Sequence, residues 1–175
     1  MMKIIIGSAR SDEHKKYSGG ARGDQRQTTV PDCSGEVSLQ NFYIHSKGWV
    51  ILRPKDKNIA KVMAALMHIA CNNKNVGYSQ SDRNAIMTCG VHTDKPTNCD
   101  CSSLVRDIVH EASSKNIPDF NTASEVNTLL ATGLFTKLTY YRDKTELYEG
   151  DILVTKTKGH TAIVVFGMSR TKDVA

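Results

Sequence analysis

The sequence predicts an α+β domain, with helices packed on an antiparallel sheet. Two segments in the middle of the chain carry apolar residues at helical spacing, and a closing series of β-branched runs has the pattern of strands. Helices and strands are thus grouped instead of alternating along the chain, which is typical of the α+β class. At 175 residues, with 39% hydrophobic content and no internal repeat, we expect one domain over residues 1–175.

The chain opens with a segment that we predict to be extended and rich in loops, residues 1–35. Its part from residue 7 onward is rich in Gly, Ser, Asp and Arg and lacks apolar periodicity. The runs "EVSLQNFYIH" and "GWVILRP" then predict two strands, because β-branched and aromatic residues are interrupted by Ser46–Lys47–Gly48 and stopped by Pro54.

The middle of the chain predicts helices. Asp56 is a suitable N-cap for the first helix, which "NNKNVG" ends, and its apolar face comprises Ile59, Val62, Met63, Leu66, Ile69 and Ala70. Residues 79–98 are polar and irregular. A second helix begins within "NCDCSSLVRDIVHEA", with Leu104, Val105, Ile108, Val109 and Ala112 on one face.

A third, short helix is expected after "TASE" at residues 122–125, which has the form of a capping box, and Gly133 ends it. The runs "LFTKLTYY", "GDILVTK" and "GHTAIVVFG" complete the chain as strands. They supply the predicted antiparallel sheet.

Charge and composition exclude several classes of protein. The net charge is +5, but the basic residues are scattered, whereas nucleic-acid binding requires them to be clustered. No run is long enough for a membrane span, and the start "MMKIIIGSAR" is too short in apolar residues for a signal peptide. Five cysteines, an odd number at uneven spacing, indicate free thiols and synthesis in a reducing cytosol.

The cysteines do not have the spacing of a metal site. Cys99 and Cys101 form a CxC, but the other cysteines stand alone and His92 has no close partner, so we expect no zinc and no other cofactor. Cys71 lies on the apolar side of the first helix and is interpreted as a small buried residue. The same interpretation is the default for Cys33 and Cys89.

Cys101 and His160 are the residues that suggest chemistry. If Asp100 caps the helix, Cys101 lies in its first turn, where free N–H groups and the helix dipole favour a thiolate. His160 follows Gly159 at the start of an apolar strand that would pack on this helix, as a Cys–His pair requires. On position alone, an ordinary surface histidine is the favoured interpretation of His160.

The motifs "DCSSLV", "GDILV" and "GHTAIVV", in this order, resemble the NlpC-like and CHAP cysteine peptidase superfamily. The segment "VGYSQSDR" is similar to the one before the cysteine in phage amidases of the pneumococcal Pal type. The opening "GSARSDE…GGARGDQ" and "VILRPKD" look like the start of phage lysin catalytic domains. The resemblance implies a papain-like NlpC/CHAP fold with Cys101, the nucleophile, at a helix N-terminus and His160 as general base.

The resemblance also suggests supporting residues. It places Tyr78 near the nucleophile, although a half-buried core tyrosine fits equally well, and Gln80 lies in the same segment. Asp100 is read as a helix cap first and a catalytic contributor second, and the N–H of Cys101 or Ser102 would form part of an oxyanion hole.

The orienting partner of His160 has no clear match. Asp173 is the only acidic residue in reach near the chain end, and a group from residues 78–84 is the alternative that we favour. Gln25 is a possible donor to an oxyanion, with a turn stabilised by Asp24 as the simpler reading. Cys99 is interpreted as having no chemical role.

These expectations describe the catalytic domain of a phage or prophage endolysin. It would hydrolyse amide bonds in bacterial peptidoglycan by a Cys–His thiol mechanism, act as a monomer, and bind neither nucleic acid nor membrane. Synthesis would take place in the host cytoplasm without a signal peptide, and a wall-binding domain would follow residue 175. The alternatives are a non-wall amidohydrolase or acyltransferase on the same scaffold, and a catalytically inert wall-binding module.

Overall fold

The computed structural model describes residues 3–12, 14–19, 36–142 and 144–174. Its main feature is an antiparallel sheet in the order β2-β1-β8-β7-β3-β6. Strands from both ends of the chain therefore meet at its centre, where β1 pairs with β8. The strands are β1 (Ile5–Ala9), β2 (Val37–Asn41), β3 (Trp49–Pro54), β6 (Phe135–Thr139), β7 (Ile152–Thr155) and β8 (Thr161–Phe166).

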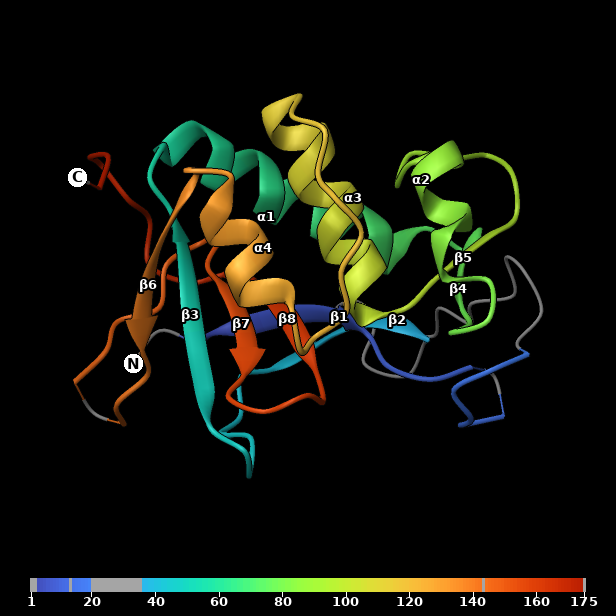
Figure 1. Cartoon of the computed structure of the whole chain (residues 1–175), viewed down its shortest axis with the longest axis horizontal. Helices are drawn as coiled ribbons and strands as arrows, with labels where there is room; N and C mark the ends of the chain where they lie inside the picture. The colour runs from blue at the N-terminus through green and yellow to red at the C-terminus, as the bar shows by residue number, and fades with distance from the viewer. Residues whose placement is uncertain (1–2, 13, 20–35, 143, 175) are drawn as a thin grey trace.

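Helices lie on one face of this sheet (Figure 1). They are α1 (Lys57–Asn72), α3 (Cys101–Ser113) and α4 (Glu125–Ala131). At one end stand the short elements η1 (Arg83–Ala85) and α2 (Ile86–Cys89), and a small parallel sheet of β4 (Val76–Tyr78) and β5 (Thr97–Cys99). The predicted α+β class is confirmed. Among the described residues, no helix has the length and apolar character to cross a membrane.

The inner strands β7 and β8 bury both of their faces, which explains why they are almost entirely apolar. On the helix side, Ile163 and Val165 of β8 join the larger core cluster together with α1 and α3. On the other side, Ala162 and Val164 join a smaller cluster around Trp49. Successive side chains of a strand point to opposite faces, so β1, β3, β7 and β8 each contribute to both clusters.

The predicted start of each long helix is confirmed by its cap. Asp56 precedes α1, and its Oδ1 accepts from the backbone N–H of Asn58 at 2.6 Å. Asp100 precedes α3 and forms a capping box with Ser103. Asx residues at this position satisfy N–H groups that have no partner within the helix.

Three expectations about local structure were wrong. The segment 1–35 is not loop throughout, since β1 is a central strand. Residues 79–98 are not wholly irregular, because they include η1, α2 and the start of β5. The run "TASE" is not a capping box: α4 begins at Glu125, after Ser124, which makes no capping bond through its side chain. Thr122 and Glu125 bind other elements instead.

The Gly-Asp pair before β7 has a structural explanation. Gly150 has φ +83°, and a Cβ there would lie 2.3 Å from the backbone oxygen of Ala60, so only glycine fits. Asp151 is fully buried, and its two oxygens accept from Arg53 at 2.9 and 2.7 Å. This part of the motif therefore holds β7, β3 and α1 together.

Candidate active site

Cys101 and His160 line the same pocket, although they are far apart in the sequence. Its volume is about 500 Å³. The lining combines aromatic and cationic side chains with the cysteine: Arg10, Tyr17, Tyr43, His45, Lys47, Tyr78, Gln80, Cys101, Gly159 and His160. The described lining residues include two cationic side chains, Arg10 and Lys47, and no carboxylate, so the pocket is positively charged.

Cys101 is the first residue of α3, where the capping box fixes the backbone. Asp100 Oδ1 accepts from the N–H of Ser103 at 2.7 Å, and the hydroxyl of Ser103 accepts from the N–H of Asp100 at 2.8 Å. The hydroxyl of Ser102 also donates to Asp100 Oδ1, at 3.0 Å. These bonds hold the half-buried thiol of Cys101 at one position on the pocket wall.

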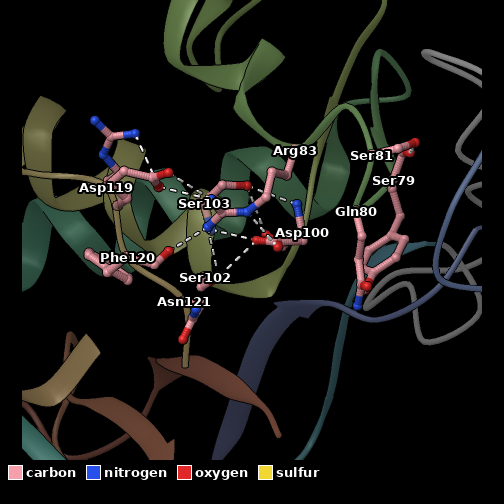
Figure 2. A network of polar contacts seen from close by, with 12 residues as sticks. Ser79, Gln80, Ser81, Arg83, Asp100, Ser102, Ser103, Asp119, Phe120 and Asn121 are labelled. Carbon is pink, nitrogen blue, oxygen red and sulfur yellow. Dashed lines mark hydrogen bonds and ion pairs between the residues drawn. The ribbon is translucent and has the colours of Figure 1, made fainter. Parts of the chain in front are cut away.

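Arg83 holds this helix start from outside (Figure 2). Its Nε donates to Asp100 Oδ2 at 2.7 Å, and its Nη2 donates to the hydroxyl of Ser102 at 3.0 Å. The same guanidinium donates from Nη1 to Asp119 at 2.8 Å and from Nη2 to the backbone oxygen of Phe120 at 2.5 Å. One side chain thereby ties the start of α3 to the segment that leads into α4.

That segment, residues 119–125, also contacts the strand that carries His160. The hydroxyl of Thr122 accepts from the N–H of Gly159 at 3.1 Å. Glu125 Oε1 accepts from the hydroxyl of Thr161 at 2.8 Å. Residues 119–125 therefore join the start of α3 to the start of β8, and we call them the bridging segment.

His160 immediately precedes β8 and is held on two sides. Its backbone N–H donates to the hydroxyl of Thr155 at 3.0 Å, and its oxygen accepts from the backbone of Thr155 at the same distance. Its ring atom Nε2 lies 3.3 Å from the hydroxyl of Ser8, which is 1% exposed on β1. The imidazole is fixed through the strand pairing of β1 with β8.

Trp49 forms an aromatic support beneath the pocket. Its ring centroid lies 6.5 Å from that of His160, 5.3 Å from that of His45 and 5.8 Å from that of Tyr43. Its indole N–H donates to the backbone oxygen of Tyr43 at 2.8 Å. The wall beside His160 is therefore rigid and dry on the side away from the pocket.

The resting pair is a neutral thiol and a neutral imidazole. Burial, followed by the charge of Asp100 and then that of Glu125, raises the pKa of Cys101 to about 12. Backbone N–H groups of Thr161 and Ser102 are directed at the sulfur and act in the lowering direction. The expectation that the helix start lowers the pKa of this thiol was wrong, because burial and acidic neighbours outweigh the N–H groups.

The imidazole is shifted toward its neutral form. Burial, followed by the charges of His45 and Arg10, lowers the pKa of His160 to about 4. A neutral imidazole is the form that accepts a proton, so His160 is available as a base throughout the neutral range.

The other expected residues are only partly brought together. Tyr78 and Gln80 line the pocket, and Gln80 Nε2 donates to the hydroxyl of Tyr78 at 3.2 Å, so neither bonds His160. Asp173 lies at the start of α1 instead, where its Oδ1 accepts from the N–H of Lys57 at 2.9 Å. Gln25, like Asp24 and Cys33, lies outside the described residues.

The remaining cysteines lie outside the pocket. Cys99 is fully buried, and its sulfur lies 3.5 Å from the backbone oxygen of Gly77. Cys71 is fully buried on α1, as predicted, whereas Cys89 is half-buried. Cys89 and Cys99 are free thiols, and within the described ranges no group of three His, Cys, Asp or Glu side chains is placed to hold a metal ion.

Sequence reasoning missed Ser8, Arg83, Thr122 and Glu125. Ser8 lies in a segment read as loop, and its partner is 152 residues away. The only local signal was Thr122 with Glu125, which the capping-box rule assigned to the helix itself. Their actual partners, Gly159 and Thr161, flank the histidine.

The chain matches one known protein family. The family described as Endolysin-like domain matches residues 6–171, almost the whole chain. The chain belongs to the endolysin-like domain family. Neither the curated proteins nor the solved structures gave a match. Membership points to a cell-wall lytic enzyme in general, and residues 6–171 include the pocket with both Cys101 and His160.

Proposed function

We propose that this endolysin-like domain is a cysteine hydrolase that cleaves amide bonds of bacterial peptidoglycan. The observation that carries the proposal is the shared pocket of Cys101 and His160, with the N–H of Thr161 directed at the cysteine sulfur. A thiol, a neutral imidazole and backbone donors are the groups that acyl transfer requires.

The reaction begins with both groups neutral. As the sulfur of Cys101 attacks the amide carbonyl, His160 takes the thiol proton, so that no free thiolate has to accumulate. The N–H of Ser102, which acts on the Cys101 sulfur in the resting state, is the donor that we assign to the developing oxyanion. His160 then protonates the leaving amine, and water hydrolyses the thioester to release the acid.

Ser8 fits the role of orienting partner for His160. If its hydroxyl accepts from Nε2–H, the other ring nitrogen, Nδ1, is the one that takes the thiol proton. The hydroxyl is buried, and so water competes little for this bond. Tyr78 is 2% exposed and its hydroxyl accepts from Gln80, so we assign it to support of the pocket wall and not to orientation of the ring.

The fold assignment belongs to the same proposal. A cysteine at the start of a helix, an antiparallel sheet beneath it and a histidine before a central strand support a papain-like fold of the NlpC/CHAP kind. The strands β1 and β2 precede α3 in the chain and extend the sheet beyond β8.

Lysis of purified cell walls, followed by turbidity, tests the proposal. Cys101→Ala and His160→Ala should abolish lysis, whereas Cys99→Ser should retain most of it because Cys99 is core. Wild-type lysis should survive EDTA and be lost after prolonged treatment with iodoacetamide. Inhibition by the chelator that zinc reverses would refute the thiol mechanism.

A further inference from the structure

Glu125 is a buried carboxyl group beside the nucleophile that the proposed mechanism does not use. It is fully buried at the first turn of α4. Its Oε1 accepts from the hydroxyl of Thr161 at 2.8 Å, while Oε2 has no hydrogen-bond partner among the described residues. A buried carboxyl oxygen without a partner costs free energy, so stability alone does not account for a glutamate here.

Thr161 connects this carboxyl group to the nucleophile. Its hydroxyl bonds Glu125, and its backbone N–H is directed at the sulfur of Cys101. Thr161 also follows His160 directly, so a shift of this residue displaces both reacting groups together. The contact between α4 and β8 therefore affects the positions of both proposed reacting residues, Cys101 and His160.

The surroundings of Glu125 shift its pKa in opposite directions. Burial is the largest effect and raises its pKa to about 8; the hydrogen bond from Thr161 lowers it. Among the charges, Asp100 raises this pKa and Arg83 lowers it. The side chain is therefore mostly neutral near pH 7 and becomes a carboxylate above about pH 8.

We propose that Glu125 is a positioning residue of the active site: it holds Thr161 against Cys101, and its ionisation opposes ionisation of the thiol. The proposal rests on the proposed function only in taking Cys101 as the nucleophile. Near neutral pH the side chain of Glu125 is uncharged and does not oppose ionisation of the Cys101 thiol. In alkaline solution a second buried negative charge so close to the sulfur is unfavourable, which sets an alkaline limit to reactivity.

The rate at which iodoacetamide alkylates Cys101, followed by peptide mass spectrometry between pH 7 and 10, tests this directly. Glu125→Gln removes the charge and keeps an oxygen for Thr161. The ratio of its rate to the wild-type rate should be near one at pH 7 and rise to about threefold or more by pH 9.5. Glu146→Gln, an exposed change of equal charge far from the pocket, should leave the ratio near one throughout.

The proposal would be overturned if the alkylation rate of Glu125→Gln relative to wild type did not change with pH. It would also be overturned if Glu146→Gln showed the same change in relative rate. If Glu125→Gln does not fold, the wild-type profile decides: its rate should rise less than tenfold per pH unit above pH 8, and an unbroken tenfold rise contradicts the proposal. Alkylation needs no wall hydrolysis. If Cys101→Ala still lyses walls, the proposed function fails, but the pH dependence of Cys101 alkylation in wild type and Glu125→Gln can still be measured.

Discussion

The hydrogen-bond partner of the His160 ring, Ser8, is the residue of the site that local sequence patterns identify least well. The imidazole contacts Ser8, whereas Asp173 caps a helix and Gln80 bonds Tyr78. The positions of Cys101 at a helix start and of His160 just before a strand were predictable, because both are local patterns. Ser8 was not, since its role depends on the pairing of β1 with β8.

Ser8→Ala should lower turnover about tenfold with little change in KM, because an unoriented imidazole samples unproductive positions while substrate contacts persist. Ser8→Thr, which keeps the hydroxyl, should recover part of the loss. Ser113→Ala is the control, since its hydroxyl bonds only Val109 and the N–H of Lys115 among the described residues, and neither lines the pocket. Turnover unaltered in Ser8→Ala would assign the orienting role to another group.

The acid limit of activity should reflect His160. Because its pKa is lowered to about 4, the neutral base persists to about pH 5, where an ordinary imidazole is mostly protonated. Hydrolysis of a soluble wall fragment, measured as kcat/KM, should therefore stay within about threefold of its neutral value at pH 5. A fall centred near pH 6.5 would show that the imidazole is exposed to water in solution.

Among the elements, the bridging segment is the one that local rules misjudged. Caps at Asp56 and Asp100 followed from sequence because their bonds are to the next turn of the same helix. Thr122 and Glu125 have the same residue types, but their side chains bond β8 and the turn before it. Local patterns do not distinguish a cap from a tertiary contact when both use the same groups.

Arg83→Gln should reduce wall lysis at least about tenfold, because it releases the bridging segment and leaves Asp100 without its cation. Arg106→Gln is a matched control: Arg106 also pairs with Asp119, at 3.4 Å, but does not touch the start of α3. Circular dichroism melting measures the stability of both variants. An equal loss of lysis in the two variants would show that the ion pair with Asp119 explains the loss, and that the contacts of Arg83 with the start of α3 do not.

For the whole molecule, the class and most elements were predictable, but the strand order was not. Alternation and turn residues located β2, β3 and β6 to β8, since these signals lie within a few residues of each strand. The order β2-β1-β8-β7-β3-β6 depends on pairings between the two ends of the chain, which no local pattern encodes. The pocket depends on this order, because β1 carries Ser8, which contacts His160, and is followed directly by Arg10, which lines the pocket.

Stability should fall as the pH rises from about 5 to 8.5. Burial, and then the neighbouring Glu111, raise the pKa of Asp107 well above its ordinary range. A carboxyl group whose pKa is raised by folding stabilises the protein below its unfolded pKa, and this contribution is lost as the pH rises through the folded value.

Urea unfolding should show this loss as a decrease on the order of 2 kcal/mol for wild type, and a smaller one for Asp107→Asn. The exposed Asp94→Asn is the control and should follow wild type. A stability that rises over this interval would mean that the carboxyl group is already ionised and paired in the folded state.

Mass spectrometry of the fragments released from purified cell walls tests the central claim most directly. Wild type and Cys99→Ser should give products that differ from the parent fragment by hydrolysis of an amide, with one water added and a new amine, while Cys101→Ala should give none. The position of the new amine identifies the bond. Amide products from Cys101→Ala, or cleavage confined to the glycan chain, would contradict the account.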